Sequence, residues 1–358
     1  MEKINKLIKL LSLLAFFVVV LAVGFSLYRT TEFNFPVSSK NKSKADLAIK
    51  NKSAKMLFVG DIMLDRHVGE KIKEEGFDYL FEGLKKDNFN FYGYDLISGN
   101  LEGAVTDGGN HYTPAQLYDF AFAPEVVNKL KNYNFTNFNL ANNHLADQGE
   151  RGIKETSANL DELKFYYYGC ADGLVEDCSL AVRQVGDLKI GLAGFSMVYK
   201  KFDLAAASEK IKDLKDKVDL IIVNVHWGTE YSHIFNKIQQ ETAHQLIDAG
   251  ADVIIGHHPH VVQGLELYKN KPIFYSLGNF IFDQYFSADT QEELAVEIDF
   301  KTDGQTVARL KPIISKQSQP GFMVGAEKER YLSKIAVWSK MEKELSEQIK
   351  LGEIKIIF

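Results

Sequence analysis

Runs of like charge are absent from this chain of 358 residues, and so are internal repeats and low-complexity tracts. The net charge of -6 argues against nucleic-acid binding, which usually requires a basic face. The lack of repeats argues against solenoid and propeller architectures. Only 2 cysteines are present, and neither has a spacing typical of metal ligands. The chain is 46% hydrophobic, which is enough to bury the core of one large domain or two modest ones.

Residues 1–29 indicate a membrane anchor. Lys3, Lys6 and Lys9 precede residues 10–28, a run without charged side chains. That run has about the length a helix needs to cross a hydrocarbon core of roughly 30 Å. The lysines are expected to stay inside, which predicts a single-pass protein of the cell membrane with a cytoplasmic N-terminus and an extracytoplasmic main domain. A cleaved secretion signal is the alternative, and it also exports the chain.

Residues 30–54 are rich in Lys, Asn and Ser and poor in apolar side chains, so they predict a flexible stalk. Further along, Cys170 and Cys178 bracket a short polar segment. A disulfide between them fits an oxidising compartment. Two free thiols are the alternative, because the sequence does not show whether the two Cβ atoms face each other.

Short apolar runs alternate with helical stretches from residue 55 onward, which predicts an α/β layered fold with much parallel sheet. A hairpin with Asp303 and Gly304 at its turn is expected to follow. The charged C-terminal residues predict a solvated helix on the domain edge. The expected strands are 55–59, 95–98, 135–140, 188–195, 219–225, 251–255, 272–276, 295–300 and 306–314, and the expected helices are 124–132, 150–163, 208–217, 238–249 and 327–350.

Polar side chains follow the expected strands at the points where these strands end. Ligands of open α/β folds bind beyond the carboxyl ends of the strands, so separate loops are expected to deliver these side chains to one rim. A single histidine at such a position is usually structural, but several loops with metal-capable residues indicate a site. The residues concerned are Asp61, Asn100, Asn143, His144, His226, His257 and His260.

The types of these side chains favour a divalent metal. Mixed oxygen and nitrogen ligands suit Mn, Zn, Fe or Co better than Ca or Mg. One or two ions are expected, and two ions that share a carboxylate can hold an attacking water and a leaving oxygen together. The expected metal ligands are Asp61, Glu102, Asn143, His226, His257 and His260.

Two further residues are candidates for catalysis. His144, next to Asn143, is free to donate a proton or to steady a substrate oxyanion. Arg66 lies in the first loop, where its planar guanidinium suits a phosphate or carboxylate. A surface salt bridge is the alternative role of Arg66.

Six segments in order resemble the CapA family of poly-γ-glutamate (capsule) synthesis proteins. They are GDIMLDR (60–66), GNLEG (99–103), ANNHLADQGERG (141–152), VHWGTEY (225–231), GADVIIGHHPHVVQG (250–264) and YSLGNFIFDQ (275–284). The resemblance implies a fold like that of calcineurin-type metallophosphatases, a layered sandwich of mostly parallel sheets flanked by helices. It also implies an N-terminal membrane segment and a role in synthesis or export of a γ-linked glutamate polymer.

The resemblance matches Asp61, Asn143 with His144, His226, and His257 with His260 to the family's metal-site positions. The bridging position falls on Asn100 or Glu102, and Glu102 is favoured as the ligand with Asn100 as its support. Supporting roles around the ligands are also expected for Glu230, His258 and Asn279. The chain departs from the metallophosphatase pattern in two ways. Met63 stands where a histidine is usual, with Asp65 and His67 as the substitutes, and His258 separates the closing histidines.

Two functions follow from this sequence. The first is a metal-dependent hydrolase of phosphoester or amide bonds in an envelope polymer or its precursor. The second is a non-catalytic subunit that binds the anionic polymer within a membrane complex for synthesis or export. A secreted nucleotidase is disfavoured because no second substrate-binding domain is evident. The expected organisation is an anchor (1–29), a stalk (30–54), a CapA-like domain (55–316) and a helical extension (317–358).

Overall fold

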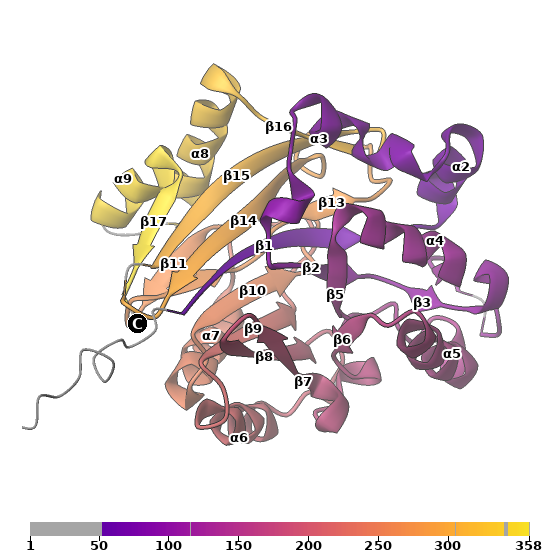
Figure 1. Ribbon diagram of the computed structural model, residues 1–358, viewed down its shortest axis with the longest axis horizontal. Helices are drawn as coiled ribbons and strands as arrows, with labels where there is room; N and C mark the ends of the chain where they lie inside the picture. Colours follow the sequence, from indigo (N-terminus) through magenta and orange to yellow (C-terminus); the bar gives the residue numbers. More distant parts are fainter. Residues whose placement is uncertain (1–51, 115, 305, 340–342, 358) are drawn as a thin grey trace, which may run out of the picture. The chain divides into compact units, whose positions relative to one another are not determined.

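The computed structural model describes residues 52–114, 116–304, 306–339 and 343–357. Its fold is mixed α/β, with two β-sheets, helices around them and a small two-stranded ladder, β3 (Ala104–Val105) with β4 (Ala121–Phe122) (Figure 1). In the part of the chain that the structure describes, no helix has both the length and the apolar character needed to cross a bilayer. The predicted anchor, and the predicted stalk up to residue 51, lie outside the described residues.

The first sheet has nine strands in the order β16-β15-β14-β1-β2-β5-β6, with β13 beside β1 and β17 beside β15. β1 pairs in parallel with β2 and β13, whereas β14 to β17 form an antiparallel edge. The strands are β1 (Ser53–Ile62), β2 (Leu96–Leu101), β5 (Phe135–Asn139), β6 (Tyr166–Tyr168), β13 (Asn279–Ile281), β14 (Glu292–Lys301), β15 (Thr306–Lys316), β16 (Gln319–Phe322) and β17 (Glu353–Ile356).

The second sheet has six strands in the order β11-β12-β10-β9-β8-β7. Its four middle strands, β12, β10, β9 and β8, are parallel, and the two edge strands are antiparallel. The sequence did not predict the edge strands β7 and β11. The strands are β7 (Leu180–Val185), β8 (Leu188–Ser196), β9 (Leu220–His226), β10 (Val253–His257), β11 (Leu265–Tyr268) and β12 (Lys271–Phe274).

The alternation of side chains along each strand explains the layers. Met56 and Phe58 of β1 point into the core between the sheets, while Leu57 and Val59 point to the helices on the other face. Strand β9 does the same, with core residues on both faces. The first sheet packs on α2 (Arg66–Glu75), α4 (Pro124–Asn128) and α5 (Gly149–Glu162), and the second on α6 (Leu204–Lys215) and α7 (Lys237–Ala249).

The C-terminal residues form two helices and a strand. Helix α8 (Gly325–Ser339) places Tyr331, Leu332 and Ile335 in the same buried cluster as residues of β14 and β15. Helix α9 (Lys343–Leu351) follows, and β17 then pairs with β15. The apolar side of this segment is therefore part of the core between the sheets. The expected single helix over 327–350 is two helices, and the final strand was not predicted.

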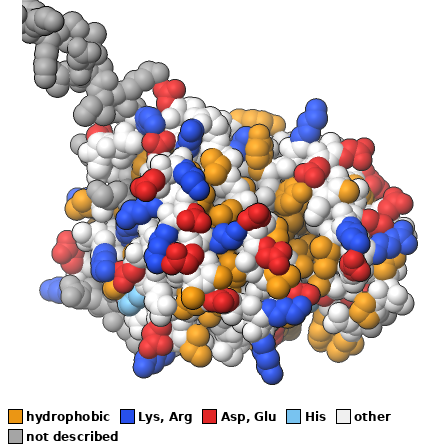
Figure 2. Space-filling model, turned by 90° about the horizontal axis from the view of Figure 1, so that it is seen from below, with side chains coloured by type: hydrophobic (Ala, Val, Ile, Leu, Met, Phe, Trp, Pro, Cys, Tyr) orange, Lys and Arg blue, Asp and Glu red, His pale blue; other side chains and the backbone are white. Residues whose placement is uncertain are grey.

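Cys170 and Cys178 form a disulfide, with their Cα atoms 5.3 Å apart. It closes the loop between β6 and β7. Figure 2 shows one face of the molecule, on which basic and acidic side chains are interspersed among hydrophobic ones rather than gathered into a field of one sign.

Strand register places the polar side chains in two rows. In the first sheet Asp61 lies opposite Asn279 on one side and Asn100 on the other, and Asn100 lies opposite Asn139. In the second sheet His226 lies opposite His257. The strands approach closely here, since a Cβ on Gly60 would lie 2.0 Å from the carbonyl oxygen of Gly278.

Candidate metal centre

Asp61 is fully buried at the end of β1 and faces two histidines. Its Oδ1 lies 3.3 Å from His257 Nδ1, and its Oδ2 lies 3.4 Å from His260 Nδ1. Burial alone would raise the pKa of this carboxyl, but the close contact and charge of the two histidines hold the pKa well below its ordinary value. Asp61 is therefore ionised in the core of the protein.

The Asn100 side chain holds the two acids of the site in place. Its Nδ2 donates to Asp61 Oδ1 (2.8 Å) and to Glu102 Oε2 (3.1 Å). Its Oδ1 accepts from the amides of Asn139 and Asn142, at 3.0 and 3.2 Å. These contacts match the supporting role expected for Asn100 beside Glu102.

Glu102 is fully buried, and one of its carboxyl oxygens has no hydrogen-bond partner. That atom, Oε1, lies 3.8 Å from His144 Nε2 and 3.8 Å from His260 Nε2. Burial raises the pKa of Glu102 well above its ordinary value, and the charge of Asp61 adds to this effect. A cation beside Oε1 would stabilise the ionised form, so this oxygen is suited to be a metal ligand.

His226 and Asn143 present their polar atoms to each other. His226 Nε2 and Asn143 Oδ1 are 2.6 Å apart, and His226 Nδ1 lies 3.4 Å from the Asn100 amide nitrogen. Burial, with the neighbouring His258 adding to it, holds the pKa of His226 well below its ordinary value. His226 is therefore a neutral imidazole, the form in which histidine binds metals.

His257, the last residue of β10, and His260, which follows β10, each have one ring nitrogen fixed by an asparagine. His257 Nε2 lies 3.1 Å from Asn224 Oδ1, which leaves Nδ1 buried without a hydrogen-bond partner. His260 Nδ1 lies 3.0 Å from Asn279 Oδ1, which turns Nε2 toward Glu102. Such contacts to the second nitrogen orient metal-binding histidines.

Two groups of three side chains could each hold a metal ion, because the three ligand atoms within each group all lie within 4.8 Å of one another. The first group is Asp61, Glu102 and His226, and the second is Glu230, His258 and His260. Burial lowers the pKa of His258 to about 4, and its Nδ1 is also buried without a partner. Unpartnered buried atoms on Glu102, His257 and His258 show that the residues present fit one or two divalent ions.

The structure brings the expected ligands together, and it adds Glu230 and His258, which the sequence suggested only as supporting residues. Met63 does not take part, because its side chain is fully buried in the apolar core. Neither of its proposed substitutes belongs to the two groups. Asp65 caps α2 and accepts from the backbone of Ala121, while His67 is exposed and pairs with Glu70.

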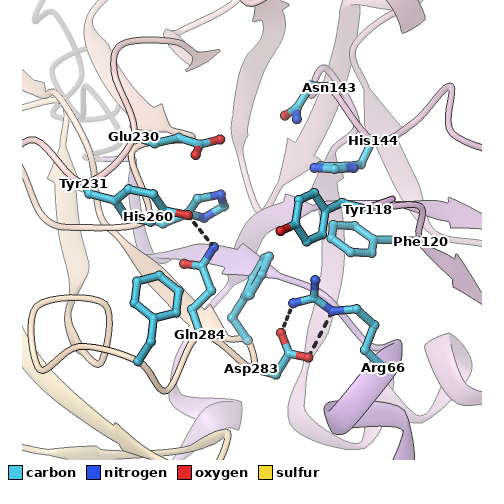
Figure 3. A pocket seen from close by; sticks show the side chains of 12 residues that line it. Arg66, Tyr118, Phe120, Asn143, His144, Glu230, Tyr231, His260, Asp283 and Gln284 are labelled. Carbon is cyan, nitrogen blue, oxygen red and sulfur yellow. Dashed lines mark hydrogen bonds and ion pairs between the residues drawn. The ribbon is translucent and has the colours of Figure 1, made fainter. Parts of the chain in front are cut away.

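A pocket of about 450 Å³ opens beside the centre, and Figure 3 shows the side chains that line it. Arg66 lies at one end, and two of its guanidinium nitrogens, Nε and Nη2, bind Asp283. The guanidinium also lies over the Phe120 ring, 5.0 Å from its centroid. Arg66 therefore faces the pocket, but it forms the salt bridge that was the alternative to anion binding.

His144 lies on the pocket wall with its ring fixed from both sides. Its Nδ1 is 2.7 Å from Asp147 Oδ2, and its ring centroid is 4.2 Å from that of Phe120. Asp147 also accepts from the backbone nitrogen of Phe120. Burial raises the pKa of Asp147, and its hydrogen bond to His144 works against that rise. His144 Nε2 is left facing Glu102.

Glu293 is a buried carboxyl outside the two groups, and its Oε2 has no hydrogen-bond partner. Burial, helped by the charge of Asp61, raises its pKa well above 4.5. The folded chain therefore binds this proton more tightly than the unfolded chain. The resulting stability is full below the unfolded pKa and is lost as the pH rises through the folded pKa.

We expect Glu293→Gln to raise the melting temperature of the metal-free protein at pH 8 and to change it little at pH 4.5. The rise should be a few degrees, since about 1 kcal/mol moves the midpoint of a large domain by about 2–4 °C. Thermal unfolding of both proteins at the two pH values measures it. A variant that is less stable at pH 8 would contradict a proton held at this site.

Fold and site together define a mixed α/β protein with two adjoining groups of metal-capable side chains. The family model for "Bacterial capsule synthesis protein PGA_cap" matches residues 55–284, and the chain belongs to this family. It is 32% identical over 335 residues to "Capsule biosynthesis protein CapA" of Bacillus anthracis, covering 86% of this chain and 80% of that protein. It is also 32% identical over 277 residues to "PGA biosynthesis protein CapA" of Bacillus subtilis, covering 74% and 72% of the two chains. These matches confirm the resemblance found in the sequence.

Solved structures give weaker likenesses. A hypothetical protein from Thermus thermophilus gives a TM-score of 0.44 at 16% identity, with 74% of this chain and 95% of that chain covered. A "Putative 5'-Nucleotidase" from Staphylococcus aureus, in complex with alpha-ketoglutarate, gives a TM-score of 0.43 at 14% identity, with coverages of 83% and 58%.

Proposed function

We propose that this chain is a metal-dependent hydrolase of the capsule-synthesis family that cleaves phosphoester bonds in an envelope polymer or its precursor. The supporting observation is the position of Glu102 Oε1. This buried, unpartnered oxygen lies 3.8 Å from His260 of the second ligand group, while Glu102 itself belongs to the first. A carboxylate between two groups of ligands is the arrangement that serves two-metal hydrolysis.

In this proposal, Asp61, Glu102 and His226 hold one ion, and Glu230, His258 and His260 hold a second. Asn143 and His257 add an amide oxygen and an imidazole nitrogen beside the first group. Divalent ions bound here would supply Lewis acidity and would activate water near neutral pH. The ions that these ligand types favour are Mn, Zn or Fe.

The protein's own contribution to the reaction centres on His144. In hydrolysis the water oxygen bonds to phosphorus and gives up a proton, the bond from phosphorus to the leaving oxygen breaks, and that leaving oxygen takes up a proton. His144 Nε2 faces the centre from the pocket wall, and Asp147 holds its Nδ1. His144 is therefore the candidate donor of that proton.

We also propose that residues 52–358 lie outside the cytoplasm, with the N-terminal segment in the cell membrane. The charge pattern of residues 1–29 supports this orientation. The Cys170–Cys178 disulfide supports an oxidising compartment, because cytosolic thiols are kept reduced. The proposed partners are the membrane, the anionic envelope polymer or its precursor, and other membrane subunits of a capsule-synthesis complex.

A non-catalytic subunit that binds the polymer is the second candidate, and Met63 favours it. Metallophosphatases use a histidine at this position as a ligand, and the buried Met63 thioether is placed in the core instead. This alternative keeps the family's role in synthesis or export, but it requires no bond cleavage.

Metal content and turnover of the full chain separate the two candidates. We expect two Mn or Zn ions per chain by elemental analysis, and metal-dependent hydrolysis of methyl 4-nitrophenyl phosphate. A metal concentration of about 100 times the Kd should also raise the free energy of unfolding by about 2.7 kcal/mol. One ion or none, without turnover, would instead support the binding subunit.

A further inference from the structure

Aromatic rings form two opposed walls of the pocket beside the metal centre. Tyr118 and Phe120, from the loop that leads to β4, lie on the side of His144, and Tyr231 lies across from them with Glu230 (Figure 3). Phe286 joins Tyr231, with the two ring centroids 5.5 Å apart. Three of these rings are open to solvent, since Tyr118, Tyr231 and Phe286 are 60%, 48% and 68% exposed. Exposed rings around a pocket indicate an apolar surface on the ligand.

The charges of the pocket argue against a polyanion as that ligand. Among the residues that line it, Arg66 is the one Lys or Arg side chain, and Asp283 binds two of its three guanidinium nitrogens. Glu230 is the other acid of the lining and belongs to the second ligand group. A polymer with a carboxylate on every unit would therefore bring negative charges to walls without a matching cation.

The ring geometry favours a sugar over a flat base. Tyr231 and Phe286 meet at 82°, so these two rings form no parallel slot for an aromatic ligand. A pyranose ring instead packs its C–H face on a single aromatic ring, and its hydroxyl groups need polar partners at the edge. Gln284 supplies such a group, because its side chain lies within the pocket lining and contacts the Tyr231 hydroxyl at 3.4 Å.

We propose that the pocket binds a sugar ring, so the substrate is a sugar phosphodiester with its single charged group at the metals. This inference rests on the proposed hydrolase and names its substrate class. The negative charge of the phosphodiester meets the metal centre, while the neutral ring lies between the aromatic walls. The ring belongs to the part of the substrate that keeps the phosphate after cleavage.

Two matched probes test the proposal on the full chain loaded with Mn²⁺. Glucose 6-(4-nitrophenyl phosphate) and methyl 4-nitrophenyl phosphate release the same leaving group, so their ratio of kcat/KM reports the sugar alone. We expect a ratio of roughly 10, which corresponds to about 1.4 kcal/mol from contact of the sugar ring with the aromatic walls. Uridine 5'-(4-nitrophenyl phosphate) is the probe for a nucleobase.

Substitutions of the aromatic residues test whether the preference for the sugar probe comes from the walls of the pocket. Phe286→Ala and Tyr231→Ala should each lower the ratio to about 3 or less, and Phe286→Tyr should restore it. Tyr92→Ala is the matched control, because Tyr92 is an exposed ring away from the pocket lining. It should leave the ratio at its original value.

The outcomes separate this inference from the proposed hydrolase. Three results would overturn the sugar site and leave the proposed hydrolase in place. They are turnover of the methyl probe with a kcat/KM ratio near 1, a preference for the uridine probe, and stronger competition by poly-γ-glutamate than by glucose 6-phosphate. If no probe is turned over, saturation-transfer NMR on glucose 6-phosphate tests whether the pocket binds the sugar ring. Transfer to the ring protons that is lost in Phe286→Ala supports the sugar site, and its absence in the unmodified protein overturns it.

Discussion

Glu102→Gln is expected to remove at least half of the bound metal and to lower turnover by at least ~10³-fold. A loss of turnover of this size is expected when a charged group of a catalytic centre is removed. Glu102 Oε1 is buried without a hydrogen-bond partner, and burial together with Asp61 raises the pKa of the carboxyl. A bound cation would keep this group ionised in the core. Glutamine preserves its shape and its contact with Asn100, but it removes the charge.

The fold should survive this change. The metal-free variant is expected to melt at the same temperature as the metal-free parent or above it, because a buried carboxyl with a raised pKa costs stability once it ionises. Addition of Mn²⁺ should no longer raise that temperature. Glu293→Gln is the matched control, since Glu293 is equally buried with a raised pKa but belongs to neither ligand group. It should keep its metal, and full metal content in Glu102→Gln would rule out Glu102 as a ligand.

The arrangement of the centre could be predicted from the sequence because parallel strands end at one edge of a sheet. Asp61 and Asn100 end neighbouring strands, as do His226 and His257, and the register places each pair side by side. The apolar runs before them are unambiguous, so the strands were found within a few residues. The family resemblance then gave the same residues independently.

The parts that could not be predicted depend on loop geometry. His258 and His260 have φ angles of 97° and 58°, which send neighbouring side chains in directions that no periodic pattern describes. For that reason Glu230 and His258 were expected only as supporting residues, although they form a group of candidate ligands with His260. In the sequence, the signal for Glu230 was the segment that follows His226, which carries this glutamate.

Several supporting residues were missed altogether. Asn139 and Asn142 donate to Asn100, and Asn224 contacts the ligand His257, but asparagine at a strand end is equally common in ordinary turns. Asp147 follows His144 by three residues in the same loop, and this spacing was the one signal of their contact. The aromatic walls come from three loops, so only the folded chain shows that they meet.

His144→Ala is expected to keep the metal and to lose about 10²–10⁴-fold in turnover, the range that a positioned proton donor contributes. His257→Ala should lose the metal itself. The difference follows from position, because His144 lies on the pocket wall, whereas His257 is fully buried with Nδ1 3.3 Å from Asp61 Oδ1. Elemental analysis, together with turnover of a phosphodiester whose alcohol leaving group needs a proton, measures the two effects in both variants, and equal loss of metal in the two would contradict this division of roles.

Asp147→Asn distinguishes proton donation by His144 from a purely structural role. Asparagine keeps the size of the side chain but removes the negative charge 2.7 Å from His144 Nδ1. The His144 ring then loses the charged partner that orients it, so kcat on a phosphodiester with an alcohol leaving group should fall while metal content stays unchanged. A ring needed only for packing would leave kcat in place, because the contact of His144 with Phe120 does not depend on that charge.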